Sequence, residues 1–296
     1  MSGPSEPYIG RAVPSTTTFK DNIFAGKVIF ATGGGSGIVY KMVEAVMRHG
    51  ASAGIMGRKV DRLTSAAQSL SDTTRQKCIP TPGDVRNYED VVKAIEATVK
   101  QFGRLDFVIC GAAGNFLAPI ENISPKGFKT VIDIDLLGTY HTVKASLDHL
   151  KKSHGAYLHV SATLQYTGIP WQAAPSSAKA GVDALSQSIA VEMGPFGVRS
   201  NVVAPGMIAG TEGADRLTPK GGEDIIATRI PLQRVGEKDD IANMAVYLFS
   251  DAGAYCTGTK FVVDGGSMHF PGPWLPYPDS SLDQQGIKDL VMGSKL

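Results

Sequence analysis

The sequence predicts an α/β fold in which a single doubly wound parallel sheet is flanked by helices. Three observations predict it. Short apolar runs alternate with segments of helical spacing, the first run ends in a glycine-rich turn, and no internal repeat interrupts the 296 residues. Apolar runs of about five residues are too short for buried helices and suit strands buried on both faces. We expect one domain over residues 26–270, preceded by an extension, 1–25, and followed by a tail, 271–296.

The composition excludes several classes of protein. Positive and negative charges nearly cancel, to a formal +1, so no basic field favours nucleic acid as a partner. Cys78, Cys110 and Cys256 are far apart and lack metal-ligand spacing, which is typical of reduced core cysteines. The six histidines show no ligand spacing either, so we expect no metal. No apolar stretch is long enough to span a bilayer.

The first apolar run, Val28–Ala31, leads into a glycine-rich turn and then into a segment with apolar residues at helical spacing, which ends near Arg48. Glycines allow the backbone to approach a phosphate, and the first N–H groups of a helix point at it. We therefore expect a phosphate-binding turn for a dinucleotide. Its residues are Thr32, Gly33, Gly35, Ser36, Gly37 and Ile38.

The second apolar run, residues 51–56, ends just before Arg58 and Lys59. In a Rossmann-type fold the end of this strand faces the adenosine ribose of the cofactor. An acidic residue there favours NAD, and an arginine accommodates the 2′-phosphate of NADP. Because two cations and no acid follow this strand, the sequence predicts NADP (NADPH).

The remaining elements continue the alternation to the end of the domain. The predicted helices cover residues 60–70, 88–102, 124–152 (interrupted near Gly138), 176–193 and 238–249; the predicted strands cover residues 78–80, 105–110, 156–161, 199–204 and 261–263. An irregular loop is expected over 163–171 and a mobile flap over 207–230. Asp84 follows a strand end, where its carboxylate can accept a hydrogen bond from an adenine amino group. The small-residue turn that ends at Gly114 follows a second strand end. The ends of strands are where an open α/β sheet binds its ligand.

These motifs together resemble those of the short-chain dehydrogenase/reductase superfamily over residues 25–268. Within it, the chain is similar to the peroxisomal 2,4-dienoyl-CoA reductases, most specifically in Cys110–Phe116, Asp133–Asp135, Ser161–Leu164 and Pro205–Gly213. The resemblance implies further cofactor contacts at Asp84, Val85, Ala113, Gly114, Lys179, Pro205, Gly206 and Ile208. It implies substrate contacts at Asn115, Phe116 and Arg216.

The departures from the superfamily pattern concern the acid catalyst. Ordinary members carry a tyrosine four residues before the lysine, and here that position is Pro175. The usual asparagine is Asp135, and the usual carbonyl-polarising serine falls around Ala162 or Thr163. If this chain were a ketone reductase, it would therefore lack its general acid. A further departure is Val39, which stands where a glycine normally follows Ile38.

Reduction of a conjugated dienoyl thioester needs no acid at the reacting oxygen, but the α-carbon must be protonated. We expect Lys179 to hold the nicotinamide ribose and Asp135 to position a water that delivers the proton. The resemblance thus implies NADPH-dependent reduction of 2,4-dienoyl-CoA to 3-enoyl-CoA in the degradation of unsaturated fatty acids. Two alternatives are a trans-2-enoyl-CoA reductase of the same fold and a catalytically silent dinucleotide-binding sensor or scaffold.

The last three residues, Ser294, Lys295 and Leu296, form the peroxisomal address read by an import receptor. We therefore expect the protein in the peroxisome, with a fatty acyl-CoA substrate. The resemblance also implies a homodimer or homotetramer built on the helices around residues 130–152 and 176–193.

Overall fold

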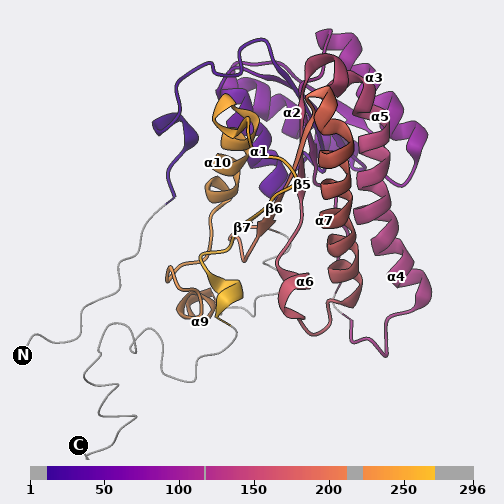
Figure 1. Cartoon of the computed structure of the whole chain (residues 1–296), viewed down its shortest axis with the longest axis vertical. Coiled ribbons are helices and arrows are strands. Elements are labelled where there is room, and N and C mark those ends of the chain that lie inside the picture. The colour runs from indigo at the N-terminus through magenta and orange to yellow at the C-terminus, as the bar shows by residue number, and fades with distance from the viewer. Residues whose placement is uncertain (1–11, 117, 212–222, 271–296) are drawn as a thin grey trace, which may run out of the picture.

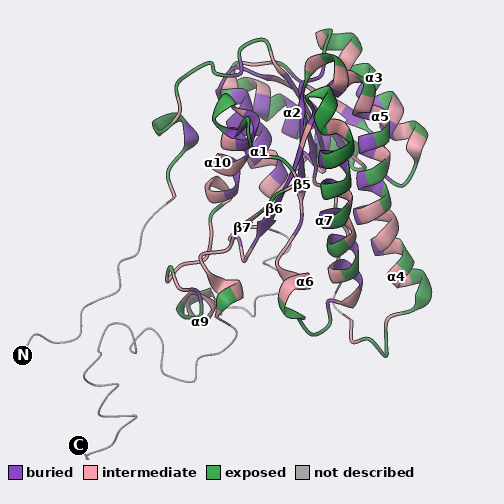
Figure 2. Ribbon diagram, viewed as in Figure 1, coloured by how far each residue is buried: buried purple, intermediate pink, exposed green. Residues whose placement is uncertain are grey.

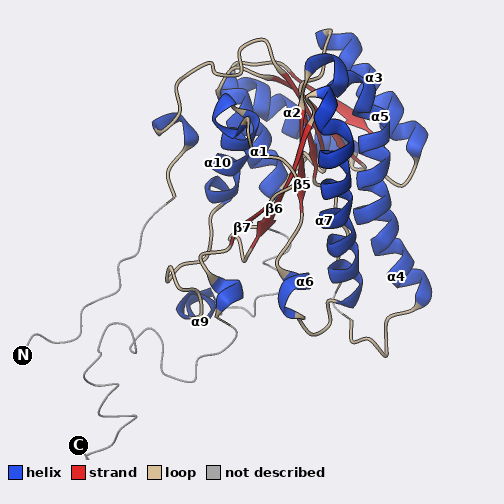
Figure 3. Cartoon of the chain, viewed as in Figure 1, coloured by secondary structure: helices blue, strands red, loops and turns tan. Residues whose placement is uncertain are grey.

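A computed structural model describes residues 12–116, 118–211 and 223–270. Within them, seven parallel strands form one sheet in the order β3-β2-β1-β4-β5-β6-β7 (Figures 1 and 3). The strands are β1 (Val28–Thr32), β2 (Ser52–Gly57), β3 (Cys78–Pro82), β4 (Phe107–Cys110), β5 (Ala156–Val160), β6 (Arg199–Pro205) and β7 (Lys260–Val263). The prediction of a single doubly wound parallel sheet is confirmed.

Helices cover both faces of the sheet. They are α1 (Gly37–Arg48), α2 (Val60–Thr74), α3 (Tyr88–Phe102), α4 (Pro125–Ile132), α5 (Gly138–Ser153), α6 (Leu164–Thr167), α7 (Ala173–Met193), α9 (Glu223–Thr228) and α10 (Lys238–Phe249). One core cluster joins the sheet to α1, α2 and α10, a second joins it to α3, α5 and α7, and a third, smaller one joins α4 to α7. Figure 2 shows the buried residues concentrated along the sheet and on the helix faces that meet it.

The strand order places a switch point beside β1. This strand pairs with β2 on one side, where Thr32 lies opposite Met56, and with β4 on the other, where Thr32 lies opposite Cys110. The connection after β1 runs toward β2 and the connection after β4 runs toward β5, in opposite directions across the sheet, so a crevice opens at the carboxyl ends of β1 and β4. The loops that follow these two strands carry the glycine turn and Gly114.

The long helical segment predicted over 124–152 is interrupted as expected near Gly138. The interruption is one turn of π-helix, Asp133–Leu137, between α4 and α5. Such turns insert an extra residue into a helix and occur frequently at functional sites. Here the turn contains Asp135 and buries its side chain.

Several element boundaries differ from the sequence prediction. Helix α2 runs on to Thr74, α7 begins at Ala173 rather than near Ser176, and the loop predicted as irregular contains the short helix α6. Part of the predicted flap, residues 212–222, lies outside the described residues, and its last part contains α9. In Figure 1, α6 and α9 lie beyond the carboxyl ends of β5, β6 and β7.

Candidate active site

The glycine turn connects β1 to the N-terminus of α1. Gly33 has φ +77°, and a Cβ on it would lie 2.8 Å from the carbonyl oxygen of Gly111. Gly37, at the first position of α1, has φ +66°, and a Cβ there would meet nothing within 4 Å. The side chain of Ser36 makes no capping hydrogen bond to the helix. The turn therefore combines backbone conformations that glycine favours with open space at a helix N-terminus, which fits the diphosphate of a dinucleotide.

Thr32 ties this turn to the loop that follows β4. Its side chain is buried, and its Oγ1 accepts hydrogen bonds from the backbone N–H groups of Gly111 (3.2 Å) and Ala112 (3.3 Å). Val39 is buried beside Gly111: a Cβ on Gly111 would lie 2.4 Å from the Val39 Cγ2 atom. The valine in place of the usual glycine is thus accommodated because residue 111 has no side chain.

The predicted adenosine end of the cofactor site lies beyond β2 and β3. Arg58 and Lys59 are exposed after β2. The Asp84 carboxylate accepts from the backbone N–H and the Nε of Arg86, each at 3.0 Å. These hydrogen bonds to the Arg86 guanidinium hold the pKa of Asp84 below its usual range. Val85 is buried, and its carbonyl oxygen pairs with His141 Nδ1 at 2.8 Å.

The predicted catalytic residues form a buried ion pair. Lys179 Nζ lies 3.2 Å from Asp135 Oδ2, and the two side chains are 9% and 2% exposed. Asp135 Oδ1 accepts from the backbone N–H of Gly114 at 2.7 Å, and Lys179 Nζ donates to the carbonyl oxygen of Val160 at 2.9 Å. The π-turn, α7, the loop after β4 and the last residue of β5 therefore converge on one charged pair.

No ionisable side chain occupies the position one turn before Lys179. Pro175 is buried in the first turn of α7, where its missing N–H costs no helical hydrogen bond. Tyr166, the nearest tyrosine in the preceding loop, donates instead to Asp183 Oδ2 at 2.7 Å. Burial and this hydrogen bond raise the pKa of Tyr166. Tyr166 is therefore committed to a different carboxylate and is no substitute for the missing acid.

The predicted substrate residues lie on the loop after β4. Asn115 Nδ2 donates to Gln172 Oε1 at 3.0 Å, and Phe116 is 42% exposed, with its ring tip beside Gly127. Ala113, on the same loop, is exposed. Arg216 lies outside the described residues, as do Ser294, Lys295 and Leu296. Gln172 was not predicted from the sequence; its position seven residues before Lys179, on the same helix face, is the signal that identifies it.

The loops after β6 and β7 pack against each other at the carboxyl ends of their strands. A Cβ on Gly206 would lie 2.6 Å from Asp264 Cβ, so this glycine allows the loops after β6 and β7 to pack closely. Ile208 is buried and forms a β-bridge with Gly236. Pro205, Gly206 and Ile208 thus lie at one end of the sheet, as predicted, and their contacts with a cofactor stay a prediction.

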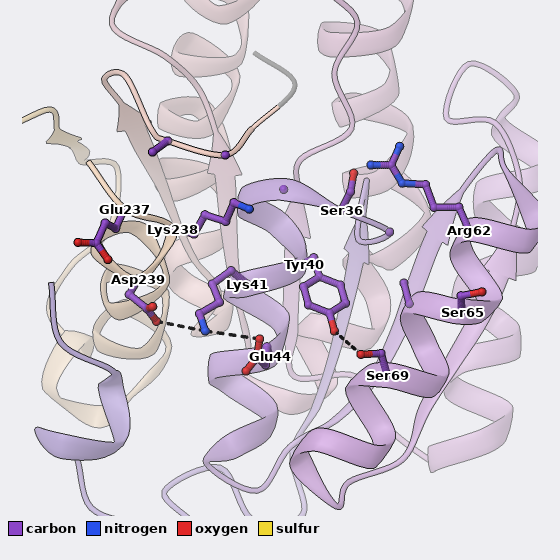
Figure 4. Close-up of a pocket in the computed structure, with 15 residues that line it drawn as sticks. Ser36, Tyr40, Lys41, Glu44, Arg62, Ser65, Ser69, Glu237, Lys238 and Asp239 are labelled. Carbon is purple, nitrogen blue, oxygen red and sulfur yellow. Dashed lines mark hydrogen bonds and ion pairs between the residues drawn. The ribbon is translucent and has the colours of Figure 1, made fainter. Parts of the chain in front are cut away.

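A groove of about 800 Å³ borders the glycine turn on the outer side of α1 (Figure 4). Its walls come from α1, α2 and the start of α10, and neither Asp135 nor Lys179 lines it. Lys41 lies 3.5 Å from both Glu44 and Asp239, and Tyr40 Oη donates to Ser69 Oγ at 3.0 Å. Lys41 is thus paired with two carboxylates, and the lining also contains Arg62, Lys238 and the glycine-turn residues Gly35, Ser36 and Gly37.

Two features are absent from the parts of the chain that the structure describes, a cluster of metal ligands and a membrane-spanning helix. Those residues contain no cluster of three or more His, Cys, Asp or Glu side chains able to hold a metal ion. None of the described helices is long and apolar enough to cross a membrane.

Comparisons with known proteins identify relatives over most of the chain. A family model described as enoyl-(acyl carrier protein) reductase matches residues 33–268. A peroxisomal 2,4-dienoyl-CoA reductase (3E-enoyl-CoA-producing) of Saccharomyces cerevisiae is 48% identical over 255 residues, which cover 85% of this chain and 87% of the relative. The enzyme of the same name from Arabidopsis thaliana is 42% identical and 92% of each chain is covered.

Solved structures of short-chain dehydrogenases have a similar fold. A short-chain type dehydrogenase/reductase from Mycobacterium ulcerans superposes with a TM-score of 0.79 at 30% identity, covering 91% of this chain and 98% of that one. A short chain dehydrogenase from Bacillus anthracis has a TM-score of 0.74 at 34% identity, covering 84% and 99%.

Proposed function

The chain belongs to the short-chain dehydrogenase/reductase family, and from this premise we propose that it catalyses the NADPH-dependent reduction of 2,4-dienoyl-CoA to 3-enoyl-CoA. This reaction serves the degradation of unsaturated fatty acids. Several relatives between 40% and 48% identical carry the name peroxisomal 2,4-dienoyl-CoA reductase. The proposal therefore rests on close relatives as well as on the site.

The observation that carries the proposal is the buried pair of Asp135 and Lys179 beside Pro175. Carbonyl reduction in this fold requires an acid near the reacting oxygen, and the proline cannot provide one. A buried carboxylate and ammonium 3.2 Å apart are instead suited to hold and polarise a water. This arrangement matches a reaction in which the proton goes to carbon.

The glycine turn, Thr32 and the loops after β4 and β6 would hold the cofactor, with Lys179 at the nicotinamide ribose. When bound, the nicotinamide supplies two electrons as hydride to the far end of the diene. The chain's own residues then have two tasks. Hydrogen-bond donors stabilise the negative charge that develops on the thioester oxygen, and a water positioned by Asp135 and Lys179 gives one proton to the α-carbon. One hydride and one proton reduce the diene to the 3-enoyl product.

Preference for NADP rests on Arg58 and Lys59, which are exposed after β2 with no acidic residue at the turn. Two cations at this place favour a cofactor with a 2′-phosphate. Peroxisomal residence rests on the relatives' names and on Ser294, Lys295 and Leu296, which an import receptor would bind.

The decisive experiment follows NADPH absorbance with purified protein and 2,4-hexadienoyl-CoA and then identifies the product. We expect fast oxidation that yields a 3-enoyl thioester, at a kcat/KM at least about tenfold higher with NADPH than with NADH. Absence of oxidation by protein that demonstrably binds NADPH would contradict the proposal.

A second candidate is a trans-2-enoyl-CoA reductase of the same fold, which the description of the matching family model favours. The same assay with trans-2-hexenoyl-CoA separates the two. Turnover of the monoene with none of the diene would select this alternative. Binding of NADPH without turnover of either thioester would select a silent dinucleotide-binding sensor.

A further inference from the structure

Gln172 is a buried side chain with an unused hydrogen-bond donor. The residue is 1% exposed, at the N-terminal boundary of α7, and its Nε2 atom has no hydrogen-bond partner among the residues that the structure describes. Buried polar groups are almost always paired, because leaving one without a partner sacrifices its hydration. An unpaired buried amide therefore indicates a group that meets its partner only when a ligand is present.

The other end of the same amide is fixed. Gln172 Oε1 accepts from Asn115 Nδ2 at 3.0 Å, and the backbone N–H of Ala118 donates to the Trp171 carbonyl oxygen at 3.3 Å. The loops after β4 and β5 are thus joined twice at this point. With its oxygen held by Asn115, the Gln172 side chain presents its Nε2 in one orientation.

The backbone around Gln172 is also unusual. Trp171 has φ +65°, in the left-handed region that a bulky residue rarely adopts. Such conformations persist only when the surrounding structure imposes them, and they concentrate at ligand sites. The strained residue directly precedes the buried amide.

Gln172 is connected to the ion pair through α7 and through the loop after β4. It precedes Lys179 by seven residues, which places it on the same face of α7 about 10.5 Å along the axis. Pro175 lies between them, at the position of the missing tyrosine. Asn115 follows Gly114, whose N–H donates to Asp135. The amide and the ion pair are therefore held by the same helix, α7, and by the same loop, the one after β4.

We propose that Gln172 Nε2 donates a hydrogen bond to the thioester carbonyl oxygen of the substrate. The inference rests on the proposed function and deepens it by assigning the group that stabilises the developing enolate. Negative charge reaches that oxygen as hydride adds to the diene, and it leaves when water protonates the α-carbon. Gln172 forms no covalent bond and transfers no proton. Because Asn115 holds this donor in place, its hydrogen bond to the thioester oxygen becomes stronger as the negative charge develops.

The first test measures carbonyl recognition without turnover. The protein with NADP bound is titrated with hexanoyl-CoA and with S-hexyl-CoA, in which a methylene replaces the carbonyl. The wild type should bind the thioester about tenfold more tightly than the thioether. Gln172→Leu should bind the two equally. The matched control is Gln165→Leu, because Gln165 Nε2 is already bonded to Ser161 and Asp183, and this variant should keep the wild-type preference.

The second test measures the chemical step. Gln172→Leu should lower kcat on 2,4-hexadienoyl-CoA by 10²–10³-fold, as expected for the loss of one oxyanion donor, with NADPH affinity within about threefold of wild type. The isotope effect on kcat with deuterated NADPH should rise, because hydride transfer becomes slower. If Gln172→Leu does not fold, Gln172→Met provides the same loss of donor with a more flexible side chain.

The outcomes separate this inference from the proposed function. A variant lacking the Gln172 amide that keeps the tenfold preference for the thioester overturns the inference, whatever its activity. A wild type that prefers the thioester through Gln172 but does not reduce dienoyl-CoA supports the inference and overturns the proposed function.

Discussion

The proposed chemistry of the site depends on a few single residues that differ from the usual residues of the family. Where ordinary family members combine tyrosine, lysine and asparagine, this chain pairs Lys179 directly with a carboxylate, Asp135. A buried pair is stable only while both charges are present, since either one alone would be an uncompensated charge in the interior. The same two residues therefore contribute to the folded state and to the proposed reaction, and tests of catalysis must separate these contributions.

Asp135→Asn is suited to separate them. Asparagine retains an oxygen for the Gly114 N–H and is the residue usual at this position, so the variant should fold and bind NADPH within about threefold of wild type. Without the carboxylate, the water is no longer oriented and polarised, and kcat should fall by 10²–10⁴-fold. Stopped-flow turnover and fluorescence titration of NADPH measure the two quantities. Near-normal turnover would remove Asp135 from the mechanism.

A second prediction at this scale concerns His159, which is fully buried. Its Nε2 lies 3.0 Å from Ser200 Oγ, and its Nδ1 has no partner within the described part of the chain. Burial, with the nearby Lys179 charge, lowers the pKa of His159 to about 3 from 6.5. Between these values the unfolded chain binds one more proton than the folded one, so the free energy of unfolding falls as the pH falls below 6.5, by about 1.4 kcal/mol per unit.

His159→Gln should remove that dependence. The side chain keeps a polar group for Ser200 but does not titrate, so the variant should lose about 2 kcal/mol less than wild type between pH 6.5 and 5.0. Urea unfolding at several pH values measures the difference. Because His49 is also buried with a lowered pKa, the comparison of the two proteins isolates His159. Parallel pH curves would show that His159 is protonated in the folded state.

At the level of elements, the site is formed where α1 and the loop after β4 pack against each other. Val39 on α1 occupies the space that a side chain at residue 111 would need. A valine in a helix is restricted to one main rotamer, so it cannot turn aside easily. The positions of α1 and of the loop after β4 are thereby coupled through one contact.

Gly111→Ala should consequently destabilise the protein by about 1–3 kcal/mol through overpacking, and Val39→Ala by a similar amount through the cavity it leaves. The double variant should be more stable than the sum predicts, by at least about 1 kcal/mol, because each change relieves the other. Thermal or urea unfolding of the four proteins tests this. Strict additivity would show that the two side-chain positions do not interact.

Much of this fold follows from local patterns in the sequence. Apolar runs with glycine turns predict β1, β4 and the turns that follow them, because each depends on neighbouring residues. The predicted helix begins near Ser176, after Pro175, whereas α7 begins at Ala173, because proline is tolerated in the first turn of a helix. The contact between Asn115 and Gln172 could not be predicted, since it joins loops 57 residues apart whose path depends on tertiary packing. The burial of Asp135 by a π-turn is of the same kind.

On the scale of the whole molecule, one prediction concerns its peroxisomal targeting signal. Removing Ser294, Lys295 and Leu296 should leave turnover unchanged, because the catalytic groups and the sheet belong to residues 26–270. An N-terminal fluorescent fusion of the shortened chain should stay in the cytosol, whereas the full chain should reach peroxisomes. Continued import of the shortened chain would reveal a second signal.

The outer surface of α7 bears on the expected assembly. Exposed positions three or four residues apart along this helix carry small side chains: Ser177, Ala180, Ala184, Ser188 and Val191. Val191, at the end of the row, is 79% exposed. Small side chains allow a second helix to approach closely, so a homodimer or homotetramer built on α7 and α5 would bury this row.

Ala184→Arg should therefore shift the protein to a smaller species, because a charge without a partner at a packed interface weakens association by at least about a hundredfold. Thr64→Arg is the matched control, since it adds the same charge at an exposed position of α2, on the other face of the sheet. Sedimentation velocity at several protein concentrations measures the oligomeric state of the wild type and of both variants. An oligomer that survives Ala184→Arg would be built on a different surface, and a monomeric wild type would exclude the assembly altogether.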